Sequence, residues 1–211
     1  MPAQDRKSQL LILCCSPHAN GSAARAARII ASGAAQKGPA PELVFLWQKK
    51  VAGCVHCDAC VKAPYTCPLA AGDDCEELFS HILSHEHVLW ISPVYFYGLP
   101  SQAKALIDRG QRFYNAASAR GIMEQEADPG TGSSTALFLA GQTKGAKLFE
   151  GSRLGVKYFM GAIGRPVNKA FALRGINTPD DFTPGTEEAL LGLGRILAGF
   201  PGRCTPPLEE L

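Results

Sequence analysis

The stretch "LLILCCSPHANGSAARAARIIASGAA", Leu10 to Ala35, predicts a buried strand, a short loop and an amphipathic helix. Its first six residues, 10–15, are apolar without alternation, which is typical of a strand buried on both faces of a parallel sheet. Behind the loop, apolar residues recur at the helical positions i, i+3, i+4 and i+7, namely Ala23, Ala26, Ala27 and Ile30. A strand leading directly into a helix is the repeating unit of α/β sheets, so this stretch favours the α/β class.

The same alternation of apolar runs and amphipathic segments continues along the chain. We expect further strands at 43–47, 87–92, 134–140 and 169–176, and further helices at 74–85, 100–113, 148–162 and from Thr183 onward. Five strands alternating with five helices predict a parallel sheet covered on both faces, with the fifth strand at an edge and a long loop at 115–133. We expect one domain over 1–211, with a cysteine-rich insert at about 53–75.

The composition argues against nucleic acids and membranes as partners. The net charge is only +2 and the basic residues are scattered, so no basic footprint for nucleic acid is present. No run of about 18 apolar residues occurs, and the N-terminal "MPAQDRKSQL" lacks the apolar centre of a signal peptide. We therefore expect a cytoplasmic protein, whose cysteines remain reduced and serve metal or redox chemistry rather than disulfides.

The loop after the first strand, "CSPHANGSA" at 15–23, has the features of a phosphate-binding turn. It contains neither G-x-x-x-x-G-K-[ST] nor G-x-G-x-x-G, the two common nucleotide fingerprints. Its polar and flexible residues are Ser16, His18, Asn20, Gly21 and Ser22. They stand directly before a helix N-terminus, where free N–H groups and the helix dipole suit a phosphate monoester. The alternative is a plain capped turn.

The loop after the third strand begins "SPVYFYGLPSQAKALIDR", at 92–109, and contains three consecutive aromatic residues, 95–97. Such a loop at the carboxyl edge of a sheet forms a flat apolar wall for a planar ring, although the aromatics can also simply seal the end of the sheet. Combined with a lysine-free phosphate loop after the first strand, it predicts an FMN site at the switch point of the sheet. The loop "AGQT" at 140–143 is expected to add a third wall, through Ala140 and Gly141.

Four cysteines stand close together in "CVHCDACVKAPYTCP", residues 54–68: Cys54, Cys57, Cys60 and Cys67. Three thiols at intervals of three residues, followed by a fourth with a proline behind it, are close to a bacterial ferredoxin run and predict a [4Fe–4S] cluster. A structural zinc site and a set of free thiols are the alternatives. Zinc sites more often use two C-x2-C pairs with a longer spacer between them, which this segment lacks.

These motifs together resemble the iron–sulfur flavoproteins, a branch of the NAD(P)H-dependent FMN reductase group. The family's opening loop reads like "GSPRKNGNT" and its second segment like "SPVYFGSVSAQLKALIDR", and its cysteine motif is C-x2-C-x2-C with a fourth Cys a few residues on. The resemblance covers about residues 10–112 in the same order. It implies an α/β, flavodoxin-like three-layer sandwich, with a five-stranded parallel sheet in the order 2-1-3-4-5 and helices on both faces.

Carried over residue by residue, the resemblance implies an FMN site in two parts. The phosphate part consists of Ser16, His18, Asn20, Gly21, Ser22 and Ala23, and the ring part consists of Pro93, Val94, Tyr95, Phe96, Tyr97 and Gly98. Two residues depart from the family pattern. His18 stands where Arg is frequent and Ala23 where Thr is usual, so a fixed positive charge becomes titratable and one hydroxyl is missing.

The resulting expectation is an FMN-dependent oxidoreductase that passes electrons between FMN and a [4Fe–4S] cluster. NAD(P)H is the expected electron donor, and a small redox protein such as ferredoxin, or a diffusible acceptor, is the expected partner. The resemblance also implies a homodimer or homotetramer. We identify no candidate for a catalytic acid or base. Two alternatives stay open: a cluster-free NAD(P)H-dependent FMN or quinone reductase, and a non-catalytic flavin or metal carrier or sensor.

Overall fold

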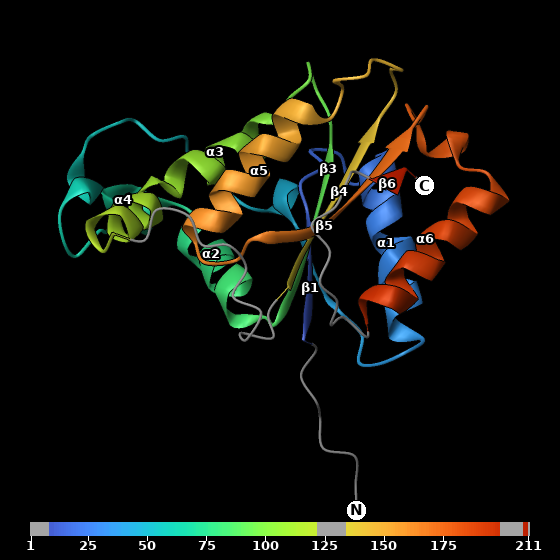
Figure 1. Cartoon of the computed structure of the whole chain (residues 1–211), viewed down its shortest axis with the longest axis horizontal. Helices are drawn as coiled ribbons and strands as arrows, with labels where there is room; N and C mark the ends of the chain where they lie inside the picture. The colour runs from blue at the N-terminus through green and yellow to red at the C-terminus, as the bar shows by residue number, and fades with distance from the viewer. Residues whose placement is uncertain (1–8, 122–133, 199–208, 211) are drawn as a thin grey trace, which may run out of the picture.

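A parallel β-sheet forms the middle layer of the structure (Figure 1). The computed structural model describes residues 9–121, 134–198 and 209–210. The sheet has the order β2-β1-β3-β4-β5-β6, and every neighbouring pair is parallel. The strands are β1 (Leu10–Cys14), β2 (Glu42–Phe45), β3 (His87–Pro93), β4 (Ser134–Gly141), β5 (Val167–Arg174) and β6 (Glu209–Glu210). The predicted order 2-1-3-4-5 is therefore confirmed, with one strand added beyond β5.

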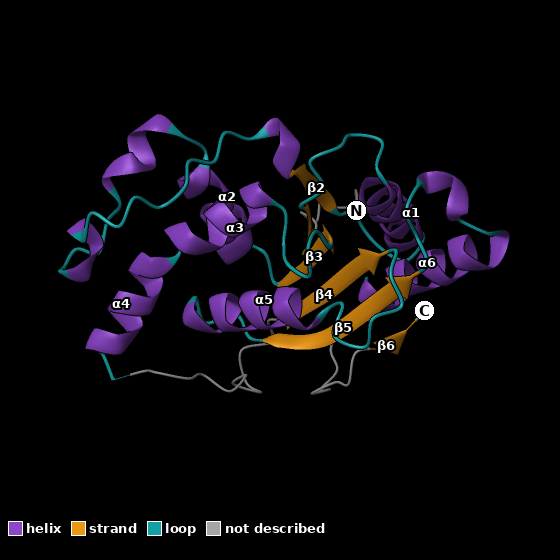
Figure 2. Cartoon of the chain, turned by 90° about the horizontal axis from the view of Figure 1, so that it is seen from above, coloured by secondary structure: helices purple, strands orange, loops and turns teal. Residues whose placement is uncertain are grey.

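Helices cover both faces of the sheet (Figure 2). Their bounds are α1 (Ser22–Ala35), α2 (Cys75–Ser84), α3 (Ser101–Arg109), α4 (Gln111–Ala119), α5 (Glu150–Ala162) and α6 (Pro184–Leu197). Helices α1 and α6 lie on one face, whereas α2, α3 and α5 lie on the other, with α4 extending beyond them. Within the described residues, no helix has the length and apolar character needed to cross a membrane.

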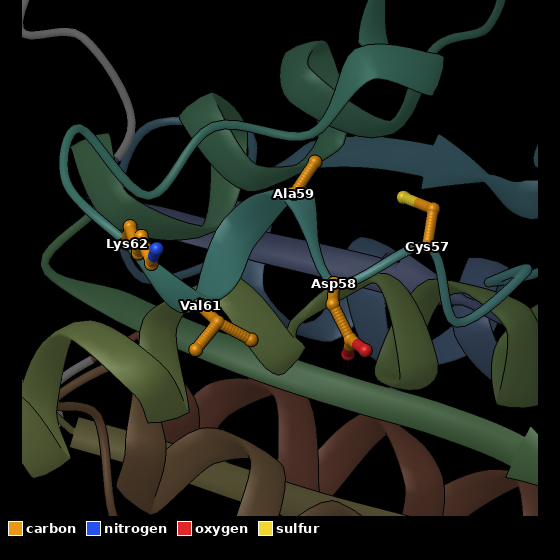
Figure 3. Close-up of a pocket in the computed structure, with 5 residues that line it drawn as sticks. All are labelled: Cys57, Asp58, Ala59, Val61 and Lys62. Atoms are coloured by element: carbon orange, nitrogen blue, oxygen red, sulfur yellow. The ribbon is translucent and has the colours of Figure 1, made fainter.

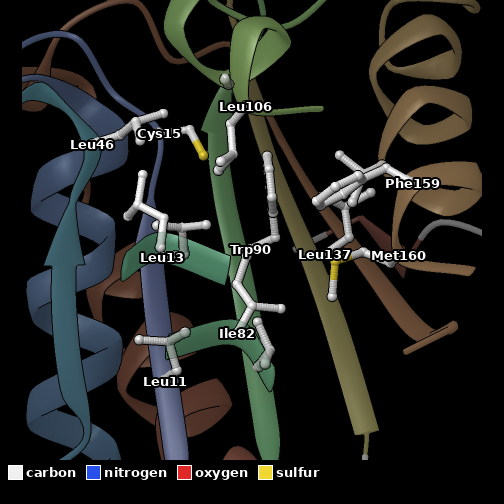
Figure 4. Close-up of a cluster of buried hydrophobic side chains, with 14 of the residues drawn as sticks. Leu11, Leu13, Cys15, Leu46, Ile82, Trp90, Leu106, Leu137, Phe159 and Met160 are labelled. Atoms are coloured by element: carbon white, nitrogen blue, oxygen red, sulfur yellow. The ribbon is translucent and has the colours of Figure 1, made fainter. Parts of the chain in front are cut away.

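Successive residues of the central strands point into two separate hydrophobic cores. Leu11 and Leu13 of β1 join Trp90 in the core beneath α2, α3 and α5, part of which is drawn in Figure 4. Their neighbour Ile12 faces the other core, together with Ile91, beneath α1 and α6. Because side chains alternate across a strand, a strand buried on both faces needs apolar residues at every position. The unbroken apolar run at the start of the chain is explained by this arrangement.

Helices α1 and α6 approach each other at two glycines. A Cβ atom added to Gly33 would lie 2.2 Å from the carbonyl oxygen of Leu191, and one added to Gly194 would lie 2.1 Å from that of Ile30. Both distances are far inside van der Waals contact, so no side chain fits at either position. The glycines therefore set the distance between the two helices on this face of the sheet.

The segment predicted as one helix over 100–113 forms two helices, α3 and α4, which meet at Gly110. Gly110 lies against the ring of Phe159, and a Cβ atom there would come within 2.5 Å of the ring carbon Cε2. This tertiary contact accompanies the change of direction, which the helical periodicity of the sequence does not reveal. The predicted loop at 115–133 begins later than expected because α4 continues to Ala119, and residues 122–133 lie outside the described residues.

The prediction that the fifth strand lies at the sheet edge is wrong. Strand β6 pairs with β5 through the register Phe171↔Glu209 and Ala172↔Glu210. A strand of two residues is defined by backbone pairing alone, so it leaves no alternation of apolar residues that a sequence pattern would reveal.

Candidate functional site

The carboxyl edge of the sheet brings three loops together, those that follow β1, β3 and β4. The central strands are neighbours in register, with Cys14 opposite Ile91 and Pro93 opposite Ala140. The pairing with β3 continues one residue past the end of β1, because the Cys15 N–H donates to the Ile91 carbonyl at 2.7 Å. The β1–β3 boundary is the point where the strand order reverses, which is where open α/β sheets bind ligands.

The loop after β1 is closed by its own hydrogen bonds. The buried Ser16 hydroxyl donates to the carbonyl of His18 at 2.9 Å and accepts from its N–H at 3.1 Å. The Gly21 N–H also donates to that carbonyl, at 3.2 Å. Ser16 thus shapes the turn, whereas the side chains of His18 and Asn20 are exposed on its outside. Of the six residues predicted to bind the phosphate, these two are the most exposed.

The N-terminus of α1 fits an anion. Gly21 is the residue before the helix, and no side chain caps the free N–H groups of the first turn. A Cβ atom at Gly21 would lie 3.1 Å from Ser16 Oγ, so a larger residue at this position would crowd the turn. The hydroxyl oxygen of Ser22 is buried and has no hydrogen-bond partner within the described part of the chain. A phosphate monoester bound at this point would satisfy these N–H groups and this hydroxyl together.

Arg28, on the second turn of α1, holds the same loop and is not indicated by any motif in the sequence. Its Nη2 donates to the carbonyl of Ala19 at 2.8 Å, and its guanidinium lies 5.0 Å from the centre of the Phe45 ring. It brings a permanent positive charge to a loop in which His18 replaces the arginine frequent in the family. Arg28 stands six residues after Ser22, almost two helical turns into α1, so its spacing does not connect it with the loop in the sequence.

The aromatic loop after β3 is a tight two-residue hairpin. Tyr95 and Gly98 exchange N–H···O bonds of 2.9 Å, while Phe96 and Tyr97 between them have φ of +49° and +63°. Left-handed conformations at both central positions define a type I′ turn, which normally selects Asn or Gly. Each left-handed residue other than glycine costs about 1–2 kcal/mol. Backbone strain of this kind is concentrated at functional sites, where a side chain is kept for its role in binding or catalysis despite its backbone preference.

The three aromatic side chains are exposed rather than packed against the sheet. Phe96 is fully exposed, and Tyr95 and Tyr97 are 42% and 51% exposed. They therefore do not seal the end of the sheet, which was the alternative interpretation of this loop. Pro93 and Val94 lie half-buried at its base, and the Val94 N–H donates to the Ala140 carbonyl at 3.0 Å. Partial burial raises the pKa of Tyr95 above its usual value.

The third loop meets the aromatic hairpin at a different place from the one expected. Ala140 and Gly141 are the last residues of β4 and are buried within the sheet. Contact with the hairpin comes from farther along the chain. A Cβ atom at Gly145 would lie 2.6 Å from the Tyr97 hydroxyl, and one at Gly151 would lie 2.5 Å from the Tyr97 carbonyl. Gly145 in the loop after β4 and Gly151 in the first turn of α5 let these two segments pack directly on Tyr97.

The cysteine segment lies between β2 and α2 in the chain and contacts α4. Its base is closed by Lys50 and Asp74: the Lys50 N–H donates to the Asp74 carboxylate at 2.7 Å, and the Asp74 N–H donates to the Lys50 carbonyl at 2.9 Å. Among the predicted ligands, Cys54 and Cys57 are exposed, whereas Cys60 and Cys67 are half-buried. The segment also contains an open hollow of about 550 Å³, lined by Cys57, Asp58, Ala59, Val61 and Lys62 (Figure 3).

Three of the four predicted ligand sulfurs accept a hydrogen bond from nitrogen. Cys54 Sγ lies 3.5 Å from the His56 backbone N, Cys60 Sγ lies 3.5 Å from Asn115 Nδ2, and Cys67 Sγ lies 3.2 Å from Arg109 Nε. His56 and Asp58, on either side of Cys57, have left-handed φ of +51° and +56°. Left-handed residues in a turn direct successive N–H groups into one concavity, as in many iron–sulfur and phosphate sites.

The segment therefore fits a sulfur-ligated centre in the type, spacing and hydrogen bonding of its residues. Over residues 9–121, 134–198 and 209–210, no group of three or more His, Cys, Asp or Glu side chains is arranged to hold a single metal ion. The structure thus brings the four thiols to one surface segment without converging them on one point.

A buried ion pair anchors this segment to α3. Arg109 Nη1 lies 2.5 Å from an oxygen of Asp73, and both side chains are only 1% exposed. The Ala52 N–H donates to the same carboxylate at 2.9 Å, and the Cys75 N–H donates to it at 3.2 Å. Burial by itself raises the pKa of Asp73, but the hydrogen bonds from Arg109, Ala52 and Cys75 outweigh it and hold the pKa below its usual value.

The sequence gives no motif for Arg109, although its position contains a signal. It follows Ala103 and Leu106 at intervals of three residues, so it continues the buried face of α3, where a charge requires a partner. The remaining described cysteines, Cys14, Cys15 and Cys75, are buried in the core. Burial raises the pKa of Cys14 to about 11 and that of Cys75 to about 12, and Cys15 is fully buried as well.

Comparison with known proteins gives a family and two groups of relatives. Residues 8–127 match the family described as NADPH-dependent FMN reductase. Two iron–sulfur flavoproteins of Methanocaldococcus jannaschii are similar in sequence. The first is 30% identical over 96 residues, 46% of this chain and 48% of the relative. The second is 32% identical over 74 residues, 35% of this chain and 36% of the relative. The matched part therefore spans less than two thirds of either relative.

Solved structures of similar fold include several reductases. A flavone reductase superimposes with a TM-score of 0.64 at 13% identity, covering 90% of this chain and 62% of that one. An FMN-dependent NADH-azoreductase of Bacillus anthracis, in complex with FMN, gives a TM-score of 0.61 at 12% identity, covering 90% and 99%. An NAD(P)H:quinone oxidoreductase of Methanothermobacter marburgensis gives 0.59 at 15% identity, covering 88% and 92%. At these identities the likeness establishes the flavodoxin-like fold alone.

Proposed function

The chain belongs to the family of NADPH-dependent FMN reductases, and from this membership we propose that it is an FMN-dependent oxidoreductase with NAD(P)H as its electron donor. The observation that carries the proposal is the anion cradle at the start of α1. It combines uncapped N–H groups with the buried, unpartnered hydroxyl of Ser22, counted over the described residues. A buried hydroxyl without a partner costs about 1–3 kcal/mol, which a bound phosphate oxygen would recover.

Each part of the site has a distinct task in this proposal. Bound FMN would supply hydride and single-electron chemistry. The first turn of α1 balances the phosphate charge, with Arg28 as a fixed cation behind the loop. The hairpin at 95–98 provides apolar surface along the ring and limits the access of water to it.

Titration calorimetry with FMN and with riboflavin tests the phosphate cradle. The flavin-free chain is expected to bind FMN at least tenfold more tightly than riboflavin, because only FMN carries the monoester. Equal affinity for the two ligands, or no affinity for FMN, would refute the cradle. Oxidation of NADPH and NADH with free FMN, quinones and a ferredoxin as acceptors then distinguishes an enzyme from a carrier. A carrier binds flavin but shows no turnover.

We propose in addition that Cys54, Cys57, Cys60 and Cys67 hold a [4Fe–4S] cluster, which would exchange electrons with FMN and a small redox protein such as ferredoxin. The hydrogen bonds to three of the four sulfurs and the left-handed turn around Cys57 support this. So does the sequence similarity to the two iron–sulfur flavoproteins of Methanocaldococcus jannaschii. A cluster would supply one-electron chemistry beside the two-electron chemistry of the flavin.

Iron and acid-labile sulfide analysis after anaerobic purification tests the cluster. About four irons per chain, with the broad visible absorption of an iron–sulfur centre, is the expected result. Flavin without iron, together with sustained NAD(P)H turnover, would instead identify a cluster-free FMN or quinone reductase. The same preparation, run on a sizing column, tests the proposed homodimer or homotetramer.

A further inference from the structure

We propose that Arg109 and Asn115 are positioning residues that hold Cys67 and Cys60 by their sulfur atoms. They preform one half of a sulfur-ligand site, and the exposed Cys54 and Cys57 complete it. The inference rests on the proposed iron–sulfur centre and states the order in which its ligands are positioned. Two ligands are held by the helical frame before any metal binds, and two are brought in by the surface turn.

The first observation is that two helix side chains reach two ligand sulfurs across long sequence separations. Arg109 is the last residue of α3, and its Nε donates to Cys67 Sγ at 3.2 Å. Asn115 lies in the middle of α4, and its Nδ2 lies 3.2 Å from the Cys60 carbonyl oxygen and 3.5 Å from Cys60 Sγ. The two donors belong to consecutive helices, α3 and α4, which are joined at Gly110.

The second observation is that Arg109 cannot easily move away from Cys67. Its Nη1 is engaged by Asp73 at 2.5 Å and by the Ala52 carbonyl at 3.2 Å, and its side chain is almost completely buried. Asp73 and Ala52 stand at the two ends of the cysteine segment. The guanidinium therefore ties both ends together and presents its remaining N–H to the sulfur in a fixed direction.

The two exposed cysteines, Cys54 and Cys57, are held in a different way. Cys54 and Cys57 lie in the turn with left-handed residues at 56 and 58, and the hydrogen bond to Cys54 Sγ comes from the backbone of the same turn. In Figure 3 the side chains of Cys57 and Asp58 leave the backbone in opposite directions at the rim of the hollow. These two thiols are thus held by local conformation, and the other two by the packed helices.

The chemical consequence concerns the charge on the sulfurs. A ligand sulfur becomes more negative when an iron–sulfur centre is reduced, so an N–H donor aimed at it favours the reduced state. Arg109 adds a full positive charge at 3.2 Å from Cys67 Sγ. Both residues therefore raise the reduction potential of a centre bound by Cys60 and Cys67, and their removal lowers it.

The first experiment uses trypsin on the full chain before and after iron reconstitution, with cleavage after Lys62 followed by mass spectrometry. Lys62 is exposed and lies between the two anchored cysteines. Asn115→Ala is expected to accelerate this cleavage about tenfold in the iron-free chain, because two hydrogen bonds that oppose local opening are lost. Asn115→Asp, which keeps the size but replaces the donor with a carboxylate, should do the same. Arg109→Lys keeps a charge beside Asp73 and is expected to give a smaller acceleration.

Gln102→Ala is the matched control. Gln102 is also an amide on α3, and its Nε2 donates to the Lys49 carbonyl at 3.2 Å without touching a sulfur. It should leave cleavage after Lys62 within twofold of the wild-type rate. Far-ultraviolet circular dichroism of each variant verifies that the chain is folded before digestion.

The second experiment measures the midpoint potential of the reconstituted centre. Asn115→Ala and Arg109→Lys are expected to shift it to more negative values, and Gln102→Ala is expected to leave it unchanged. Cleavage after Lys62 at the wild-type rate in Asn115→Ala, or unchanged potentials in both variants, overturns the positioning role while the proposed centre stands. A wild-type chain that takes up no iron refutes the proposed centre itself, whatever the cleavage rates are.

Discussion

Replacing Ser22 with alanine is expected to weaken FMN binding without weakening the fold. Ser22 is the first residue of α1, and its buried hydroxyl oxygen has no partner among residues 9–121, 134–198 and 209–210. A hydrogen bond to a charged group contributes about 1.5–3 kcal/mol. Losing such a bond to the phosphate raises the Kd for FMN by a factor of about 10 to 150.

The flavin-free protein should respond in the opposite direction. Because Ser22→Ala removes a buried polar atom that lacks a partner, the free energy of unfolding should stay constant or rise by about 1 kcal/mol. For a chain of this size that corresponds to an increase in Tm of about 2–4 °C. A substitution that merely damaged the fold would lower both stability and affinity, so the pair of measurements separates the two explanations.

Calorimetry provides both readouts: titration for the Kd and differential scanning for the Tm of the flavin-free chain. Riboflavin serves as an internal reference, since it lacks the phosphate and its affinity should not change. Ser32→Ala is the control on the same helix, because the Ser32 hydroxyl is exposed and donates only to the Arg28 carbonyl. If Ser22→Ala binds FMN as tightly as the wild type, or loses affinity for riboflavin to the same extent, the phosphate is not held at this helix N-terminus.

Three further predictions address packing, charge and backbone strain. Gly33→Ala should lower the unfolding free energy by about 1–3 kcal/mol in urea titrations, because its Cβ would lie 2.2 Å from the Leu191 carbonyl oxygen; Gly161→Ala, with open space around it, should not. Asp73→Asn should cost about 3–5 kcal/mol, because its buried arginine partner loses its counter-charge. The folded-state pKa of Asp73 is below its ordinary 3.8, so its contribution is complete above that pH and lost in more acidic solution, and the Asn variant should lack this loss of stability in acid. Phe96→Asn should raise the Tm by a few degrees, since Asn tolerates a φ of +49°, while calorimetry shows weaker FMN binding; a lower Tm contradicts the strain argument.

Local patterns in the chain are sufficient to predict the layered α/β fold. The apolar run at 10–14 has to be buried on both faces wherever it lies, and the periodic alanines of α1 have to face a core. The strand before the phosphate loop and the aromatic residues after β3 are likewise visible in single segments of a few residues. These features depend on the period of side chains along the backbone, which is a property of neighbours in sequence.

Other features depend on residues far apart in sequence. The break between α3 and α4 accompanies the contact of Gly110 with Phe159, and strand β6 exists only because its backbone pairs with β5. The left-handed aromatic hairpin packs against Gly145, almost 50 positions farther along the chain. No periodicity or local propensity reports such contacts.

The cysteine segment shows most clearly the difference between what local sequence predicts and what tertiary contacts determine. The cysteine spacing predicts a sulfur-ligand site. The residues that donate to its sulfurs, Arg109 and Asn115, lie 42 and 55 positions beyond the cysteines that they contact. Their side chains reach Cys67 and Cys60 only after α3 and α4 have packed beside the segment. The proposed ligands can be predicted from the sequence, because that prediction needs only residue type and spacing. Their anchoring is a product of tertiary packing, because a hydrogen bond is made wherever the folded chain brings donor and acceptor within reach.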